Sequence, residues 1–388
     1  MVNIKNNILN FDTLLEVKEN SLILDILDYE KDINNNATIK IKGSRKLDNK
    51  IKFDLISLEE KNNKIIFQNL LLDENSKIIN LDNANFNFLD RTGNNNKFDI
   101  KRKNNDYYLQ GSILNANNLI ENLIKNNDDS SFKFLDKKIK MFVKIEDLLL
   151  DKNYKLENFE GDLSLKNQEI INGNLKGSFS KNKKFNFTVK SVDNKKITTL
   201  FLDEAGPIVN RYKFIRGFKG GSLDFYSTKQ NDETIAKIKI FDFKLKELPA
   251  LTKLLTLASL QGIADLVSGE GISFDEFEMN FKNMKNNMTI EEIYAIGPAI
   301  SILMNGYVEK NKLVSLRGTL VPATTINKVI GSIPILGNIL VGSKTGEGVF
   351  GVSFKIKGPP KKLETTVNPI KTLTPRFITR TLEKIKKN

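Results

Sequence analysis

The stretch Thr234–Leu245, TIAKIKIFDFKL, decides the fold. Apolar residues occupy every second position from Ala236 to Ile240, with lysines between them, and this two-residue period is typical of a half-buried β-strand. The apolar period then shifts by one residue at Phe241 and continues to Leu245. Such a shift predicts a bulge or a bend that re-aims the side chains within one long strand.

A helical pattern follows, FKLKELPALTKLLTLASLQGIADLVSGEG at 243–271. Leu251, Leu254 and Leu255 fall on one helical face, and the apolar residues after Gly262 fall on another. This pattern predicts a helix over Leu251–Leu266 that either bends at the glycine or is covered nearly all round. An apolar helix within β-type sequence needs a protein core, a lipid-filled groove or a membrane surface to lie against.

Short alternating runs fill the rest of the chain and predict an antiparallel β meander. We expect a repetitive β segment at 1–200, a second β region with helices at 201–373, and a C-terminal helix at 374–388. Three predicted strands outside the central stretch illustrate the pattern: Ala37–Ile41, Lys140–Ile145 and Lys184–Val189. Three further helix candidates interrupt it: Asn117–Lys125, Glu204–Phe214 and Thr324–Leu340, the last of which is broken by Gly331, Pro334 and Gly337. A hairpin turn is predicted at Glu309–Lys312.

The C-terminal segment Thr374–Asn388 has strong helix signals, with a capping threonine followed by proline. One face of this helix is basic and carries Arg376, Arg380, Lys384 and Lys387. Such a face can lie on an anionic membrane surface. The alternative is that the helix docks on its own domain and its cations face water.

Composition excludes several classes of function. The 388 residues contain no His, Cys or Trp, which removes His-based catalysis, thiolate or imidazole metal sites, and disulfides. No carboxylate cluster or phosphate-binding motif has diagnostic spacing, so we expect no enzyme activity, no metal and no cofactor. The net charge is +13, but the basic residues alternate with acidic ones and no nucleic-acid motif occurs, so we expect no nucleic-acid partner.

No apolar run is long enough to span a bilayer, and the first residues do not form a signal peptide. Taken literally, the chain would be soluble and cytosolic. If it is one piece of a longer protein, these absences do not bear on its compartment.

From about Leu202 to Phe377 the sequence resembles the C-terminal region of AsmA-like proteins, the bridge-like lipid-transfer group that includes YhdP and TamB, in its α-proteobacterial form. Several short motifs carry the resemblance in order: Phe218–Leu223, Ile240–Phe243, Leu248-Pro249, Ser268–Phe274, Ala295–Ala299, Gly318–Pro322, Ile333–Asn338, Gly346–Phe350, Val367–Pro369 and Leu373–Phe377. Residues 1 to about 200 resemble the family only as generic strand repeats.

The resemblance implies a mainly β fold, in which a long antiparallel sheet curls into an open groove with a few short helices. It implies a periplasmic lipid-transfer protein of the Gram-negative envelope, held to the inner membrane by an N-terminal helix that this chain lacks. Such a protein conducts phospholipids towards the outer membrane. We therefore expect phospholipid acyl chains and a membrane surface as partners.

Apolar residues at alternating strand positions are the candidate walls of this groove: Phe225, Ile238, Ile240, Phe277, Phe281, Ile302, Met304, Leu316, Phe350, Val352 and Phe354. The alternative is that they form an ordinary core packed against the helices. A different function is also open: the chain could be a structural or assembly factor for outer-membrane biogenesis that pairs a sheet edge with an envelope protein. A third possibility is a basic module that binds membranes or polyanions through the C-terminal helix.

Overall fold

The computed structural model describes residues 2–5, 8–45, 50–125, 138–166, 169–211, 217–246, 251–252, 255–256, 271–322, 351–360 and 362–370. Within the predicted helix Leu251–Leu266, the four residues described are helical. The predicted helices Thr324–Leu340 and Thr374–Asn388 lie outside the described residues, and so does Phe350.

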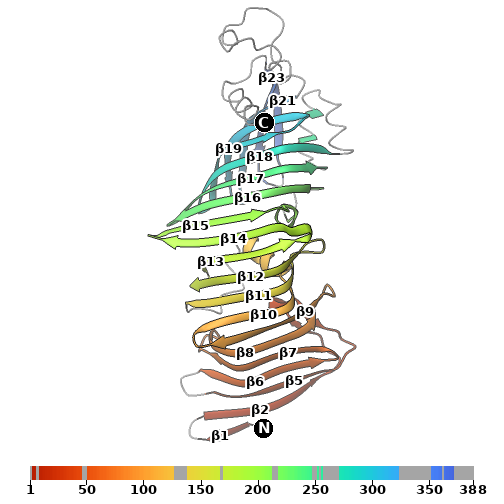
Figure 1. Cartoon of the computed structure of the whole chain (residues 1–388), viewed down its shortest axis with the longest axis vertical. Helices are drawn as coiled ribbons and strands as arrows, with labels where there is room; N and C mark the ends of the chain where they lie inside the picture. Colours follow the sequence, from red (N-terminus) through yellow and green to blue (C-terminus); the bar gives the residue numbers. More distant parts are fainter. Residues whose placement is uncertain are drawn as a thin grey trace, which may run out of the picture. The chain divides into compact units, whose positions relative to one another are not determined.

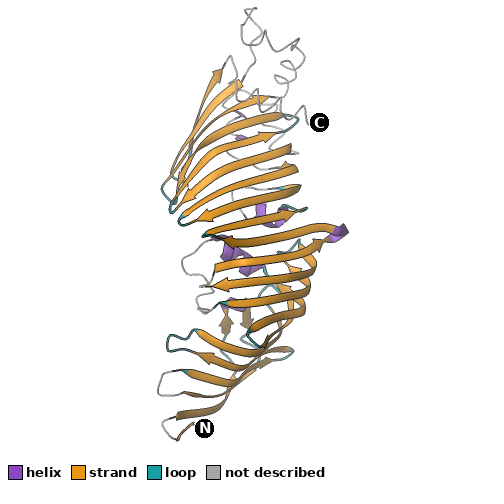
Figure 2. Ribbon diagram, turned by 60° about the vertical axis from the view of Figure 1, so that its left-hand side comes forward, coloured by secondary structure: helices purple, strands orange, loops and turns teal. Residues whose placement is uncertain are grey.

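The chain divides into two compact units, residues 1–191 and 192–388. The sequence predicted a boundary nearby, between residues 200 and 201. Each unit is built mainly of β-strands that pair into a large, mostly antiparallel sheet (Figure 1). Each sheet is curved and open, and its helices are short (Figure 2). The predicted fold class, mainly β with a long antiparallel sheet, is confirmed.

In the N-terminal unit β1 pairs with β2, β2 pairs with β5, and each described strand from β5 to β13 pairs with the next. The predicted strands at 37–41, 140–145 and 184–189 lie in β5, β11 and β14. The strands are β1 (Val2–Lys5), β2 (Ile8–Val17), β5 (Ala37–Arg45), β6 (Ile51–Glu60), β7 (Asn63–Leu72), β8 (Ile78–Leu89), β9 (Asn95–Lys103), β10 (Asp106–Asn115), β11 (Ile139–Leu149), β12 (Lys155–Lys166), β13 (Glu169–Phe179) and β14 (Lys183–Val192).

One pairing corrects the predicted antiparallel meander, because β10 and β11 are parallel. Parallel neighbours need a crossover connection rather than a tight turn. The crossover contains α1 (Asn117–Lys125), a helix that the sequence predicted with these bounds. The Asn115 Oδ1 accepts a hydrogen bond of 3.0 Å from the Asn117 backbone N–H, which satisfies one of the open donors at the start of the helix.

The C-terminal unit is an antiparallel ladder from β15 to β23, in which each strand pairs with the next. Its strands are β15 (Lys195–Leu202), β16 (Lys219–Gln230), β17 (Glu233–Leu245), β18 (Ile272–Met284), β19 (Asn287–Ile296), β20 (Ile300–Glu309), β21 (Leu313–Pro322), β22 (Gly351–Gly358) and β23 (Glu364–Ile370). The hairpin predicted at 309–312 joins β20 to β21. The helix predicted over Glu204–Phe214 is shorter than expected: α2 spans Gly206–Val209, residues 210 and 211 form a turn, and 212–216 lie outside the described residues.

The bend predicted within Thr234–Leu245 is present in β17. Asp242 has a left-handed φ of 52°, and on the neighbouring strand Gly220 and Gly221 have φ values of 71° and 79°. A Cβ at Gly221 would come within 2.9 Å of the Phe241 carbonyl oxygen, so a side chain there would clash with the backbone. Beyond the bend, Phe243 stacks between Phe218 and Phe274, with ring centroids 5.4 Å apart on each side.

A small hairpin that the sequence did not predict packs on the N-terminal unit. It consists of β3 (Leu22–Leu24), a single 3-10 turn (Asp25–Leu27) and β4 (Tyr29–Lys31). Tyr29 is fully buried, contacts Phe88 edge-on at 5.8 Å, and donates a hydrogen bond of 2.6 Å to the Glu60 carboxylate. The fully buried Lys31 ammonium donates to three backbone carbonyls, at 2.7–2.9 Å.

Glu60 makes the stability of this hairpin dependent on pH. Burial raises the pKa of the Glu60 carboxyl, but hydrogen bonds from Tyr29, Asn35 and Asn63 outweigh burial and leave the pKa below its ordinary value. A carboxyl with a lowered pKa contributes stability above its unfolded pKa of about 4.3 and loses this contribution as pH falls through the folded value.

We therefore expect Glu60→Gln to lower the free energy of unfolding of this region by about 1–3 kcal/mol at neutral pH, because it weakens a buried charged network. The measurement is hydrogen exchange of peptides from β3, β4 and β6 over a pH series. The difference between variant and parent should shrink in acid. A difference that stays constant with pH would show that the Glu60 charge is not responsible.

Candidate functional site: an apolar sheet face

Apolar side chains form continuous rows across the C-terminal sheet. Strand register aligns residues of neighbouring strands, and alternate residues of one strand share a face. The first row is Leu223, Ile240, Phe277, Ala295, Ile302, Leu320 and Val352. The second row is Phe225, Ile238, Met279, Ile293, Met304, Gly318 and Phe354. The third row is Ser227, Ala236, Phe281, Ile290, Gly306, Leu316 and Ile356.

These three rows lie on one face of the sheet, which we call the apolar face. Burial differs along it. The first row is almost entirely buried, with Val352 only 1% exposed, whereas Phe277 is half-buried. In the second and third rows Phe225, Met304 and Leu316 are half-buried. The apolar face therefore retains large side chains that are in partial contact with solvent.

The structure brings together every predicted groove residue that it describes. In the first row lie Ile240, Phe277, Ile302 and Val352; in the second, Phe225, Ile238, Met304 and Phe354; in the third, Phe281 and Leu316. The predicted set omits Leu223, Ala295 and Leu320, although each has the same alternation as its neighbours. Ile293 was hidden by a bulge in β19, where the register shifts between Ile290 and Ile293.

Gly318 shows how closely the second row is packed. A Cβ built at Gly318 would lie 2.7 Å from the Phe354 ring and 2.4 Å from the Leu303 carbonyl oxygen. The missing side chain therefore makes room for the phenylalanine ring of the next strand.

The opposite face of the same strands is charged. Glu278 is 3% exposed, and its carboxylate forms ion pairs with the Lys237 and Lys239 ammonium groups at 3.0 and 3.2 Å. On the next strand burial raises the pKa of the Asp224 carboxyl, and the nearby Lys239 partly offsets this effect. The two faces of the sheet therefore differ sharply in polarity.

The N-terminal sheet repeats the arrangement. One row runs through Ile41, Ile56, Phe67, Ala84, Ile100, Leu109 and Val143. A neighbouring row runs through Leu15, Ile39, Leu58, Ile65, Phe86 and Phe98. Phe86 contacts Phe67 edge-on at 5.5 Å and stacks on Phe98 at 4.5 Å, so aromatic rings join the rows. Most of the first of these rows is half-buried.

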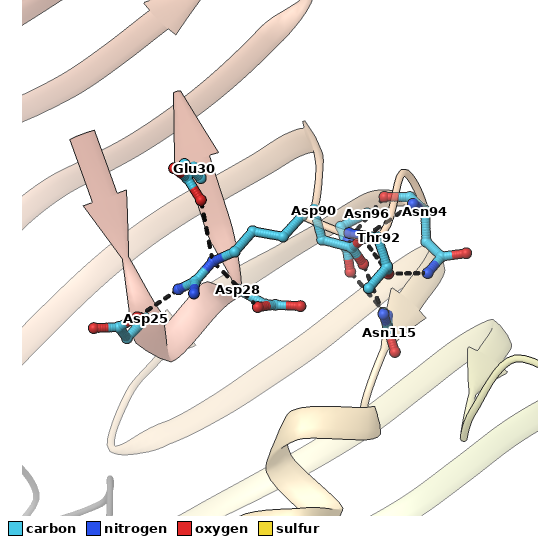
Figure 3. A network of polar contacts seen from close by, with 9 residues as sticks. Asp25, Asp28, Glu30, Asp90, Thr92, Asn94, Asn96 and Asn115 are labelled. Carbon is cyan, nitrogen blue, oxygen red and sulfur yellow. Dashed lines mark hydrogen bonds and ion pairs between the residues drawn. The ribbon is translucent and has the colours of Figure 1, made fainter. Parts of the chain in front are cut away.

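A polar network fastens the β3–β4 hairpin and the start of α1 to the turn between β8 and β9 (Figure 3). Asp90 accepts hydrogen bonds from the Thr92 hydroxyl at 2.7 Å and from the Asn115 amide at 2.6 Å. Burial raises the pKa of the Asp90 carboxyl, but these and other hydrogen bonds outweigh burial and leave it lowered. Arg91 pairs with Asp25 and lies 3.4 Å from the Asp28 carboxylate. The hairpin is thus held at strand ends of the N-terminal sheet by charge as well as by packing.

Among the described residues, no group of three or more acidic side chains is placed to hold a metal ion. Among the same residues, no helix is long and apolar enough to cross a membrane. Arg376, Arg380, Lys384 and Lys387, the predicted membrane-surface residues, lie outside them.

Comparisons with known proteins give no match: no family model, no curated protein and no solved structure corresponds to this chain. The resemblance to AsmA-like proteins therefore stays a prediction.

Proposed function

We propose that this protein is a non-enzymatic lipid-transfer protein whose apolar sheet face binds phospholipid acyl chains. The observation that carries the proposal is the set of apolar rows that crosses β16–β22 in register while several of its side chains remain half-buried. Each methylene buried against such a surface contributes roughly 0.8 kcal/mol, so an acyl chain is held without directional contacts.

Lipid movement follows from the repetition of the rows. Neighbouring strands present similar apolar side chains at matching positions. An acyl chain that moves by one strand therefore exchanges one set of apolar contacts for a similar set. The polar headgroup stays in water, and no catalytic residue is needed. In this proposal the chain works in the periplasm of a Gram-negative cell, between the inner and outer membranes, as the resemblance to AsmA-like proteins implies.

Lipid extraction from the purified protein tests the proposal. We expect phospholipid to co-purify with the full chain and to appear by mass spectrometry under native conditions. Protein stripped of lipid should also accelerate the movement of a fluorescent phospholipid between vesicles. If the purified protein carries no lipid and the stripped protein neither binds nor moves the fluorescent one, the proposal fails.

The C-terminal segment supplies a separate prediction about membrane contact. We expect removal of residues 374–388 to weaken binding to vesicles that contain anionic phospholipid, because about 1 kcal/mol is contributed by each basic residue near such a surface. Co-sedimentation at rising salt measures this effect, and the binding that is lost should be the salt-sensitive part. Equal binding by the shortened and full chains would assign membrane contact to another surface.

A further inference from the structure

The first wide strand of the N-terminal sheet, β2, has an edge that no described strand covers over part of its length. β5 pairs with β2 along Leu9–Val17, but on the other side of β2 the short strand β1 pairs only with Ile8–Phe11. Among the described strands, none pairs with β2 on that side over Asp12–Val17. A bare strand edge of this kind is a template for pairing with another chain.

An apolar row of the N-terminal sheet runs out to this edge. Leu15 is the last residue of the row that continues through Ile39, Leu58, Ile65 and Phe86. Leu58, Ile65 and Phe86 are each at most 5% exposed, whereas Leu15 is 45% exposed. On the opposite face Leu14 is 64% exposed. The row therefore ends at the edge without the neighbour that would bury its last member.

We propose that the edge Asp12–Val17, together with Lys18 directly after it, pairs with the same segment of a second copy of this chain, in antiparallel orientation about a two-fold axis. Such an interface is isologous, so the segment must be complementary to itself. With Leu15 opposite the partner's Leu15, Thr13 faces the partner's Val17 on the apolar side. On the polar side Asp12 faces the partner's Lys18, and this pair of opposite charges occurs twice.

The charge pattern selects this register over its neighbours. A shift that puts Leu14 opposite the partner's Leu14 would bring Asp12 against the partner's Glu16. The shift in the other direction would place Glu16 opposite the partner's Glu16. Like charges directly opposite one another destabilise a strand pair, whereas opposite charges stabilise it. Lys18 now lies 3.3 Å from Glu16 of its own chain, in an exposed pair that can exchange at little cost.

The paired edges would join the apolar rows of two N-terminal sheets into one continuous apolar face. This inference does not rest on lipid binding, because the register and the charge pattern specify it without a ligand. Its test is carried out on lipid-free protein and is separate from the tests of the proposed function.

Site-directed cross-linking tests the register. The chain contains no cysteine, so Leu15→Cys introduces a single thiol that would face its own copy across the two-fold axis. The matched control is Leu14→Cys, which in this register faces the partner's Glu16. We expect Leu15→Cys to form the disulfide-linked dimer faster, although Leu14 is the more exposed residue. Random collision would favour the control, so equal or faster cross-linking of Leu14→Cys would overturn the proposal.

Sedimentation velocity over a concentration series supplies the second arm. The parent chain should show a reversible dimer. Asp12→Lys and Lys18→Asp should each raise the dimer dissociation constant roughly tenfold, because each change affects two symmetric cross-strand pairs. The double variant Asp12→Lys/Lys18→Asp should restore dimerisation, since the exchanged charges are again complementary. A chain that stays monomeric at all concentrations, or a double variant no better than the single ones, would refute the pairing.

Discussion

The variant Ile238→Asp is expected to lose acyl-chain binding, and Ile235→Asp is expected to keep it. Both residues are isoleucines of β17, but Ile238 lies in the second row of the apolar face, between Phe225 and Met279. Ile235 points to the opposite face, pairs with Thr228 and Lys282, and is 47% exposed. The two changes are identical in chemistry and differ only in the face that they alter.

The expected loss at Ile238 follows from two effects. The acyl chain loses contact with an apolar side chain worth roughly 1.5–3 kcal/mol when fully buried, and it has to lie beside a hydrated carboxylate. A free-energy loss of this size corresponds to an affinity that is about ten to a hundred times weaker. Fluorescence titration of lipid-free protein with a labelled fatty acid measures the affinity.

Two controls keep this result interpretable. Circular dichroism and thermal unfolding establish that Ile238→Asp is still folded, and Ile238→Ala should lose less affinity than Ile238→Asp because it removes apolar contact but adds no charge. Equal loss in Ile235→Asp and Ile238→Asp would mean that the apolar face is not where acyl chains bind.

The largest loss of stability is expected for Phe243→Ala. Phe243 is 5% exposed and stacks with Phe218 and Phe274 beyond the bend in β17. Truncation of a buried phenylalanine to alanine costs about 3–5 kcal/mol, because transfer free energy is lost and a cavity remains. The neighbouring rings lie on both sides, Phe218 directly before β16 and Phe274 in β18, so this change is expected to loosen β16, β17 and β18 together.

Hydrogen exchange of β16–β18 peptides in the full chain measures the effect of Phe243→Ala. The matched control is Phe201→Ala in β15, where the ring is 37% exposed and the expected change is within about 0.5 kcal/mol. If both variants exchange alike, the aromatic stack contributes little to the stability of the unit.

Much of the fold could be predicted because the alternation of apolar and polar residues is typical of half-buried β-strands. The shift of period in Thr234–Leu245 predicted a bend at Phe241, one residue before the left-handed Asp242, since a strand bend displaces the apolar set by one position. Helix α1 was predicted with its bounds, because its apolar residues fall on one helical side. Where the structure describes them, the residues selected by this alternation lie on one face of the C-terminal sheet.

The missed features depend on contacts that are distant in sequence. The parallel pairing of β10 and β11 could not be predicted, because the alternation of apolar and polar residues does not indicate whether two neighbouring strands run parallel or antiparallel. The β3–β4 hairpin was not predicted, because the local sequence around Tyr29 and Lys31 is polar and gives no sign that these two side chains are buried. Their burial depends on Glu60, Phe88 and backbone carbonyls supplied from elsewhere.

The antiparallel ladder has a consequence for how such a chain can change its length. Every strand from β15 to β23 contacts its immediate neighbours, and two consecutive strands return the backbone to its starting side. Insertion or removal of one hairpin would therefore leave every other side chain on the same face of the sheet. Insertion or removal of a single strand would instead reverse the direction of every strand that follows. Growth by whole hairpins lets evolution set the span of the protein in increments of about 10 Å, at an inter-strand spacing of about 4.8 Å.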